Sequence, residues 1–160
     1  MTEGTFSHDR VGINITTQLS NHLRGKPCQP HGKDLKLLIG NKVRYPDAYV
    51  SCGQYQNADK RGRDPVVIFE VLSDSTERTD LVEKNEEYAS LPSVRRYVVL
   101  QQNRIGGMMF ERRDGDWIGH LLNEQSLIQM PEIDIEIPLV AFYEEVSFDD
   151  PTVASGPDQA

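Results

Sequence analysis

The 160-residue sequence lacks the patterns that mark several large classes of protein. No apolar run approaches the length that crosses a bilayer, and the N-terminus lacks the basic and then apolar segments of a secretory signal. The only cysteines are Cys28 and Cys52, and no metal-ligand spacing surrounds them. Because nothing indicates export, both are expected to be reduced thiols in a cytoplasmic protein without a membrane span.

Several common catalytic signatures are also missing. The sequence has no glycine-rich phosphate loop, no Ser-His-Asp pattern and no zinc-ligand cluster. It contains neither a groove-reading helix nor a set of aromatic residues that would identify a nucleic-acid sequence. Function must therefore be sought in single charged residues that lie where a charge is costly.

Positive charge is absent from the last part of the chain. Residues 114–160 contain 11 Asp and Glu but no Lys or Arg, whereas residues 1–113 contain all 17 basic residues against 14 acidic ones. The net charge of −8 is thus a C-terminal property, and it does not exclude a phosphate-bearing partner. Acidic tails are also common and keep proteins soluble. We expect one domain over residues 1–146 and a disordered acidic tail over residues 147–160.

What is present predicts an α/β fold. Apolar residues recur every four positions in the first segment, which indicates an amphipathic helix with Ser7 as its N-cap. Asp74 and Glu77 resemble a capping box for a second helix, and Asp114-Gly115 is a strong hairpin signal. Helices are expected at 6–24, 75–90 and 138–145, and strands at 34–39, 45–51, 65–72, 95–101, 105–112, 117–122 and 133–137. This order predicts a mixed β-sheet flanked by helices, with an additional C-terminal hairpin.

One charge interrupts the most apolar strand. Residues 65–72 are apolar on both faces except for Glu70, which is typical of a central strand buried on both sides. A carboxylate is rarely buried there without a partner.

Asp47 lies in the preceding strand and would be about 4.8 Å from Glu70 if the two strands are neighbours. Two such carboxylates repel unless a cation lies between them or one is protonated, and Mg²⁺ suits this arrangement. Alternatively, Asp47 follows a proline in a strand-edge turn and Glu70 pairs with an arginine. Spacing alone leaves both interpretations open.

A lysine lies within the apolar stripe of the second helix. Lys84 follows Leu81 by three residues and therefore faces the sheet with the other residues of that stripe, Leu81, Tyr88 and Leu91. It can extend its ammonium past the edge of the sheet, or it can reach an anionic partner such as Glu70. Asp80, one turn earlier, can pair with Lys84 as an ordinary helix-surface ion pair.

Two further features have an ordinary and a functional interpretation. His8 continues the stripe of the first helix one turn before Val11, where a histidine is more often a core-edge residue than a ligand. Lys60, Arg61 and Arg63 can clamp phosphates, although a charged loop is usually only solvated.

With these residues identified, the chain resembles the PD-(D/E)xK nuclease superfamily, which has the restriction-endonuclease-like fold. Within it, the sequence is most similar to the Uma-two family of bacterial restriction-endonuclease-like proteins. The matching segments are GTFSHDRV, YPDAYVSCG and VVIFEVLSDSTERTDLVEKNEEYASLPSVRRYVVL, with weaker matches at RRDGDW and PLVAFYEEV. The resemblance spans nearly the whole chain up to the tail.

The resemblance implies a catalytic site. Asp47 and Glu70 would bind the divalent metal, Mg²⁺ or Mn²⁺, with the carbonyl of Val71 as a further ligand. The superfamily places a lysine two residues after the glutamate, but Leu72 is found here, and the resemblance suggests Lys84 as a migrated catalytic lysine. Supporting residues at the rim of the site would be His8, Asp34, Asp80, Ser73 and Ser75.

The resemblance also implies a function and partners. The expected protein is a metal-dependent endonuclease that hydrolyses phosphodiester bonds in DNA, and nucleases of this fold often form homodimers. The alternative is a catalytically degenerate module of the same fold, which binds nucleic acid or a protein partner without cleavage.

Overall fold

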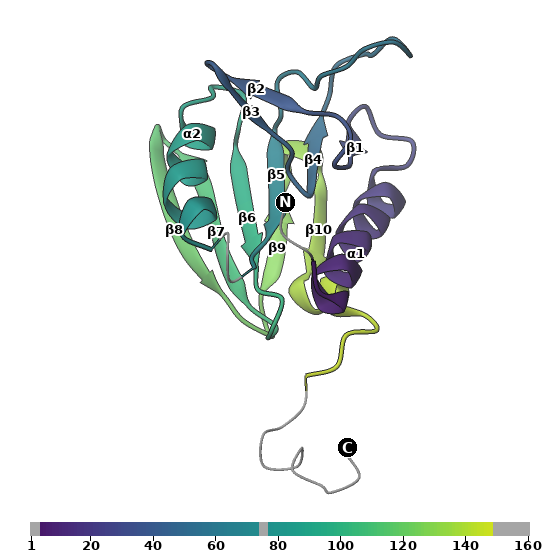
Figure 1. Ribbon diagram of the computed structural model, residues 1–160, viewed down its shortest axis with the longest axis vertical. Coiled ribbons are helices and arrows are strands. Elements are labelled where there is room, and N and C mark those ends of the chain that lie inside the picture. The colour runs from purple at the N-terminus through teal and green to yellow at the C-terminus, as the bar shows by residue number, and fades with distance from the viewer. Residues whose placement is uncertain (1–3, 74–76, 149–160) are drawn as a thin grey trace, which may run out of the picture.

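A mixed six-stranded sheet forms the centre of the computed structural model, which describes residues 4–73 and 77–148 (Figure 1). Helix α1 (Phe6–Leu23) packs on one face, and the turn η1 (Thr79–Lys84) with helix α2 (Asn85–Ala89) packs on the other. The strands, in spatial order, are β1 (Gln29–His31), β4 (Ala48–Ser51), β5 (Val67–Val71), β6 (Arg96–Leu100), β7 (Gly107–Arg113) and β8 (Asp116–Leu122). The prediction of a mixed sheet flanked by helices is confirmed.

Two small antiparallel sheets cover the two faces. The hairpin of β2 (Leu37–Ile39) and β3 (Lys42–Arg44) packs on the α2 side, at the top of the view in Figure 1. Strands β9 and β10 pack on the α1 side together with two short 3₁₀ helices. These elements are β9 (Leu127–Met130), η2 (Pro131–Ile133), β10 (Ile135–Pro138) and η3 (Leu139–Tyr143).

Helix α1 forms as its apolar spacing predicts. The stripe residues are buried against the sheet: Val11, Ile15, Leu19 and Leu23. The N-cap is Thr5, whose hydroxyl accepts the backbone N–H of His8 at 3.1 Å, so the prediction of Ser7 was wrong by two residues. The helix ends just before Gly25, which adopts the left-handed conformation (φ 81°) that glycine tolerates best.

Strand β5 is the central buried strand that its composition indicates. All five residues of β5 are buried. It pairs antiparallel with β4 and parallel with β6, and the parallel pair requires the crossover through η1 and α2. Alternate side chains therefore enter the apolar cluster under α1 or the one under α2.

The second helix differs from a plain α-helix. It includes the π-helical segment Thr79–Lys84, which continues directly into α2. A π-turn is wider than an α-turn and occurs frequently at functional sites. The sequence analysis did not foresee it, because a single six-residue segment with i→i+5 hydrogen bonds is too short to be recognised from apolar spacing. Asp74 and Ser75 lie outside the described residues, so the predicted capping box is not seen.

Short strands account for most other differences from the sequence analysis. Strands β2 and β4 are shorter than predicted, and β1, β3 and β9 were missed because three or four residues show too little alternation to recognise. Ile133, expected in a strand, lies in η2 because Asp134 turns the chain with a φ of 56°. The hairpin at Asp114-Gly115 is confirmed, and the predicted terminal helix is the 3₁₀ helix η3.

The two cysteines correct another expectation. Cys28 and Cys52 form a disulfide bond, whereas both were expected to be reduced. The reason is the missed strand β1, since the register Gln29↔Ser51, extended by one pair, places the two cysteines directly opposite each other. Across the described residues, no helix has the length and apolar character that crossing a membrane requires. Of the predicted tail, residues 149–160 lie outside the described residues, and Phe148 packs against Tyr143.

Candidate active site

The pairing of β4 with β5 brings the two predicted carboxylates together. The register pairs Ala48 with Phe69, and one further step places Asp47 opposite Glu70. Residues that face each other across an antiparallel pair point to the same side of the sheet. That side is the α2 side, because Ile68, two residues before Glu70, belongs to the apolar cluster that contains Tyr88.

Asp47 is held by two contacts. One carboxylate oxygen accepts the backbone N–H of Val71 at 2.7 Å, and the other lies 3.2 Å from the ammonium of Lys33. Lys33 was missed in the sequence analysis. No signal in the sequence distinguishes it from a solvated lysine, because its position depends on the three-residue strand β1 that precedes it.

Glu70 is paired with a cation in the interior. Its side chain is 3% exposed, and the ammonium of Lys84 donates to Glu70 Oε2 at 2.6 Å. The same ammonium lies 2.8 Å from Asp80, which is equally buried. The expectation of an ordinary surface pair between Asp80 and Lys84 is therefore wrong, because the π-turn directs Asp80 inward, where its backbone carbonyl accepts the hydroxyl of Tyr97.

Burial and charge act in opposite directions on this pair. Burial raises the pKa of Glu70 to about 8, although the positive charge of Lys84 opposes that rise. Burial alone would lower the pKa of Lys84, but Glu70 and Asp80 together raise it above its ordinary value. The ammonium of Lys84 thus compensates two carboxylates, and any cation that binds Glu70 must compete with it.

His8 links helix α1 to this region. Its Nε2 lies 3.1 Å from the carbonyl oxygen of Val71. A carbonyl can only accept, so Nε2 carries the donated proton. Val71 is therefore held on both sides, by Asp47 at its N–H and by His8 at its carbonyl.

The remaining predicted residues are less closely connected. Asp34 is exposed in the turn between β1 and β2, and within the described ranges no hydrogen bond or ion pair joins it to Asp47 or Glu70. Ser73 is half-buried just past β5 and borders a cavity of about 250 Å³. Ser75 lies outside the described residues. Within the described residues, no group of three or more His, Cys, Asp or Glu side chains is arranged to hold a metal ion.

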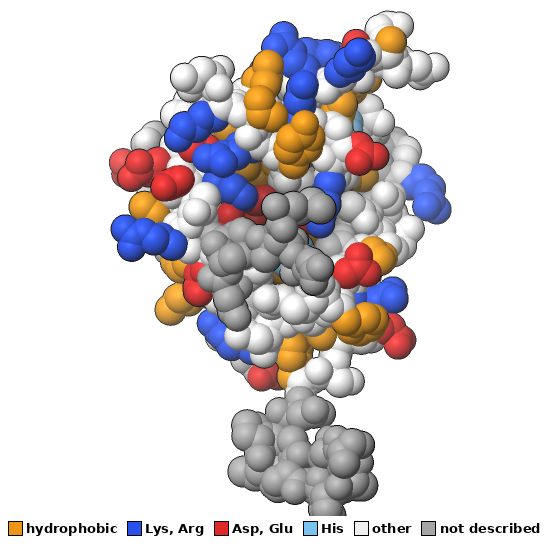
Figure 2. Space-filling model, in the orientation of Figure 1, with side chains coloured by type: hydrophobic (Ala, Val, Ile, Leu, Met, Phe, Trp, Pro, Cys, Tyr) orange, Lys and Arg blue, Asp and Glu red, His pale blue; other side chains and the backbone are white. Residues whose placement is uncertain are grey.

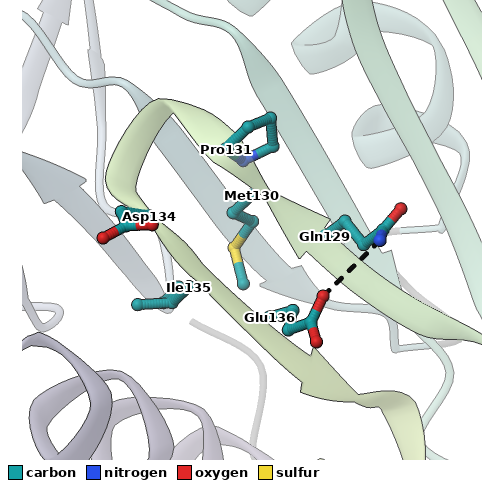
Figure 3. Close-up of a pocket in the computed structure, with 6 residues that line it drawn as sticks. All are labelled: Gln129, Met130, Pro131, Asp134, Ile135 and Glu136. Carbon is teal, nitrogen blue, oxygen red and sulfur yellow. Dashed lines mark hydrogen bonds between the residues drawn. The ribbon is translucent and has the colours of Figure 1, made fainter.

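Two hollows show where a ligand can approach. A cleft of about 230 Å³ lies between Asp47, Lys33 and the first turns of α1. A larger hollow of about 420 Å³ is formed by β9, η2 and β10, and Figure 3 shows its lining residues, with Gln129 donating to Glu136. This larger hollow belongs to the α1 side of the sheet, opposite to the face that carries Glu70. Of these two hollows, only the smaller one is lined by a predicted site residue, Asp47.

Comparisons with known proteins identify the family. The model of the Uma2 family, described as "Putative restriction endonuclease", matches residues 1–139. An uncharacterized protein of Synechocystis sp. is 29% identical over 157 residues, which cover 91% of this chain and 78% of the relative.

A solved structure agrees in fold. The crystal structure of a "putative nuclease belonging to DUF820" from Anabaena variabilis matches with a TM-score of 0.69 and 12% identity, over 89% of this chain and 82% of that chain. At this identity the similarity establishes the fold alone. The family match covers most of the chain and includes all the residues of the Asp47, Glu70 and Lys84 arrangement, so the chain belongs to the Uma2 family of restriction-endonuclease-like proteins.

Proposed function

We propose that this protein is an endonuclease that hydrolyses phosphodiester bonds in DNA with Mg²⁺ or Mn²⁺ held by Asp47 and Glu70. The observation that supports it most is the buried Glu70, a carboxylate on the central strand that lies in register with a second carboxylate. A purely structural strand would not need two adjacent acids at this point.

The donor set fits a hard divalent cation. Mg²⁺ prefers oxygen ligands and uses one or two carboxylates while it keeps several waters. Asp47 and Glu70 supply the carboxylates, and the carbonyl of Val71 is a further oxygen beside them. When bound, such a cation polarises the scissile phosphate and lowers the pKa of a bound water.

The residues of the chain have separate roles in this proposal. Lys84 releases part of its contact with Glu70 and stabilises the negative charge that develops on the phosphate, while Asp80 keeps the ammonium in place. His8 fixes the carbonyl of Val71, and Asp47 fixes its N–H, so the end of β5 stays rigid. Lys33, whose side chain is largely exposed, moves from Asp47 to the phosphate backbone.

A second candidate is a module of this fold that binds nucleic acid or a protein partner without cleavage. Lys84 and Lys33 favour it, because their ammonium groups already neutralise charge at the two carboxylates. In that case the ion pairs stabilise the fold, and a cation that binds there supports no cleavage.

Cleavage of supercoiled plasmid and of circular single-stranded DNA, each with Mg²⁺ or Mn²⁺, tests the proposal. Asp47→Asn and Glu70→Gln should each lower the cleavage rate by at least ~100-fold, and Glu124→Gln, an exposed acid, should not. Unchanged cleavage in both site variants would disprove the metal site. Calorimetric binding of Mn²⁺ without any cleavage by the natural chain would favour the second candidate.

A further inference from the structure

The outer face of the hairpin β2–β3 carries apolar and aromatic side chains in contact with water. Leu38 is 39% exposed, Val43 46% and Tyr45 57%. Leu38 and Val43 are direct partners in the hairpin register, and Tyr45 lies two residues after Val43, so all three point outward. An exposed apolar cluster of this kind on a monomer indicates a binding surface.

Positive charge borders these side chains. One step beyond the pair Leu37↔Arg44, the register places Lys36 beside Tyr45. The backbone of Lys36 in turn forms an isolated parallel β-bridge with that of Arg61. Tyr45, Lys36 and Arg61 therefore lie in one row across three segments of chain. Within the described parts of the chain neither Lys36 nor Arg61 has an ion-pair partner.

The basic side chains on the inner face of the hairpin already have an acidic partner. Arg44 makes two hydrogen bonds of 2.7 Å to Glu87 of α2, and Lys42 adds a contact of 3.1 Å to the same carboxylate. These ion pairs fasten the hairpin to α2, so its outer face is presented in a fixed position. Figure 2 shows hydrophobic and basic side chains gathered at this end of the molecule.

A hollow adjoins the cluster. Leu38 and Arg61 line it together with Leu91 and Pro92, and its volume is about 340 Å³. The site lies close by along the chain, because Tyr45 precedes Asp47 by two residues, roughly 7 Å of extended backbone. A nucleic-acid strand that lies on Tyr45 can therefore place a neighbouring phosphate beside a cation held by Asp47.

We infer that this face, defined by Lys36, Leu38, Val43, Tyr45 and Arg61 and called the hairpin platform, binds a single-stranded segment of nucleic acid. Exposed aromatic and apolar side chains bind the faces of unstacked bases, and the adjacent basic groups bind the phosphates. Duplex DNA hides its base faces, so Tyr45 has nothing to stack on there. The inference rests on the proposed function, because it names the substrate class of the same site.

The test is fluorescence anisotropy of labelled oligothymidylate and of a labelled duplex, each with the full chain in EDTA so that no cleavage occurs. Tyr45→Ala should weaken binding of oligothymidylate by roughly 5- to 150-fold, the equivalent of about 1–3 kcal/mol for one stacked base, and leave the duplex nearly unchanged. Tyr45→Phe should retain the binding of the natural chain. Leu121→Ala, which removes an exposed apolar side chain from β8, is the matched control and should change neither affinity.

A second arm tests the charges. The double variant Lys36→Ala with Arg61→Ala should reduce the slope of log affinity against log salt by about 0.7 for each phosphate that is no longer neutralised. Arg24→Ala, an exposed arginine at the end of α1, should leave the slope unchanged.

Three results would overturn the inference: equal losses for single strand and duplex, no loss with Tyr45→Ala, or a dimer that Tyr45→Ala dissociates while nucleic-acid binding stays the same. Failure of the proposed function gives a different result, namely cleavage that Glu70→Gln leaves unchanged while Tyr45→Ala still weakens binding of the single strand.

Discussion

Two buried ion-pair clusters lie on opposite faces of the same sheet, and they differ in the ratio of carboxylates to cationic groups. In the cluster at the candidate site, Lys84 contacts Glu70 and Asp80, and Lys33 contacts Asp47. Three carboxylates therefore share two ammonium groups.

The second cluster surrounds Arg96 on β6. Arg96 makes bidentate hydrogen bonds of 2.7 and 3.0 Å to Glu132 and lies opposite Glu111 in the register. Glu111 is also within 3.1 Å of Arg113 and 2.6 Å of His120. Here two carboxylates meet two guanidinium groups, so their charges compensate each other without a further cation.

The difference separates structural from chemical use of buried charge. Both clusters bury carboxylates at a cost, and both contain a cation that reduces it. Only the site has more carboxyl groups than cationic side chains next to a cleft, so a divalent cation can take the place of a proton or an ammonium group there. We therefore expect substitutions in the Arg96 cluster to affect stability and substitutions at the site to affect cleavage.

The largest effect is expected for Arg96→Met. The change leaves Glu132, whose side chain is 12% exposed, without its main partner, and the free energy of unfolding should fall by about 3 kcal/mol. Urea denaturation of the metal-free chain measures this. A loss below about 1 kcal/mol would show that the cluster is dispensable for the fold.

Glu70→Gln should give the opposite profile. Glutamine keeps the size of the side chain and can still accept from Lys84, so we expect the free energy of unfolding to change by less than about 1 kcal/mol while cleavage falls by at least ~100-fold. Glu132→Gln is the matched variant, because it weakens the structural cluster and should keep cleavage per folded molecule. If Glu132→Gln abolished cleavage as Glu70→Gln does, the distinction between a structural and a catalytic cluster would be wrong.

A more exposed ion pair should show a smaller effect with a defined pH dependence. Hydrogen bonds from Arg44, aided by Lys42, hold the pKa of Glu87 below its ordinary value. Because the folded-state pKa is the lower one, this pair stabilises the fold above the ordinary pKa of 4.5 and loses its effect as the pH falls through the folded value. Glu87→Gln should cost about 1.5 kcal/mol at neutral pH and little in acid, as measured by urea denaturation at both pH values. An equal loss at both would show that packing, not charge, matters here.

The smallest effect is expected for Lys33→Gln. Its contact with Asp47 lies at the surface, where an ion pair contributes less than about 1 kcal/mol, so removing it should tighten Mn²⁺ binding by about 2- to 5-fold. Lys26→Gln removes a surface lysine paired with Asp134 and should leave Mn²⁺ affinity unchanged in calorimetry. Weaker binding in Lys33→Gln would contradict competition between Lys33 and the metal.

The sequence was sufficient for elements whose signal is local. The four-residue spacing identified α1, and the unbroken apolar segment identified β5 and drew attention to Glu70 as its single charge. The apolar stripe of the second helix also pointed to Lys84 as a side chain facing the sheet, and the structure places its ammonium on Glu70.

Features that depend on pairing between strands far apart in the sequence could not be predicted from local patterns. Strand β1 exists because it pairs with β4, and without it neither the disulfide bond nor the position of Lys33 can be inferred. The inward direction of Asp80 depends on a six-residue π-helical segment, which is too short to be recognised from the sequence. Tyr45 appears in the sequence as one aromatic residue before a proline, and only the hairpin register places it beside Lys36.

The bond between Cys28 and Cys52 has a consequence for the topology of the chain. It spans a sequence separation of 24 residues, and the closed ring contains Lys33, the β2–β3 hairpin and Asp47. In the chain-entropy view, a ring of this length restricts the unfolded ensemble by about 3 kcal/mol. In the oxidised chain the two ends of the loop that contains the β2–β3 hairpin and Asp47 therefore stay joined even when the domain opens. Reduction removes this link, and the two ends can then separate.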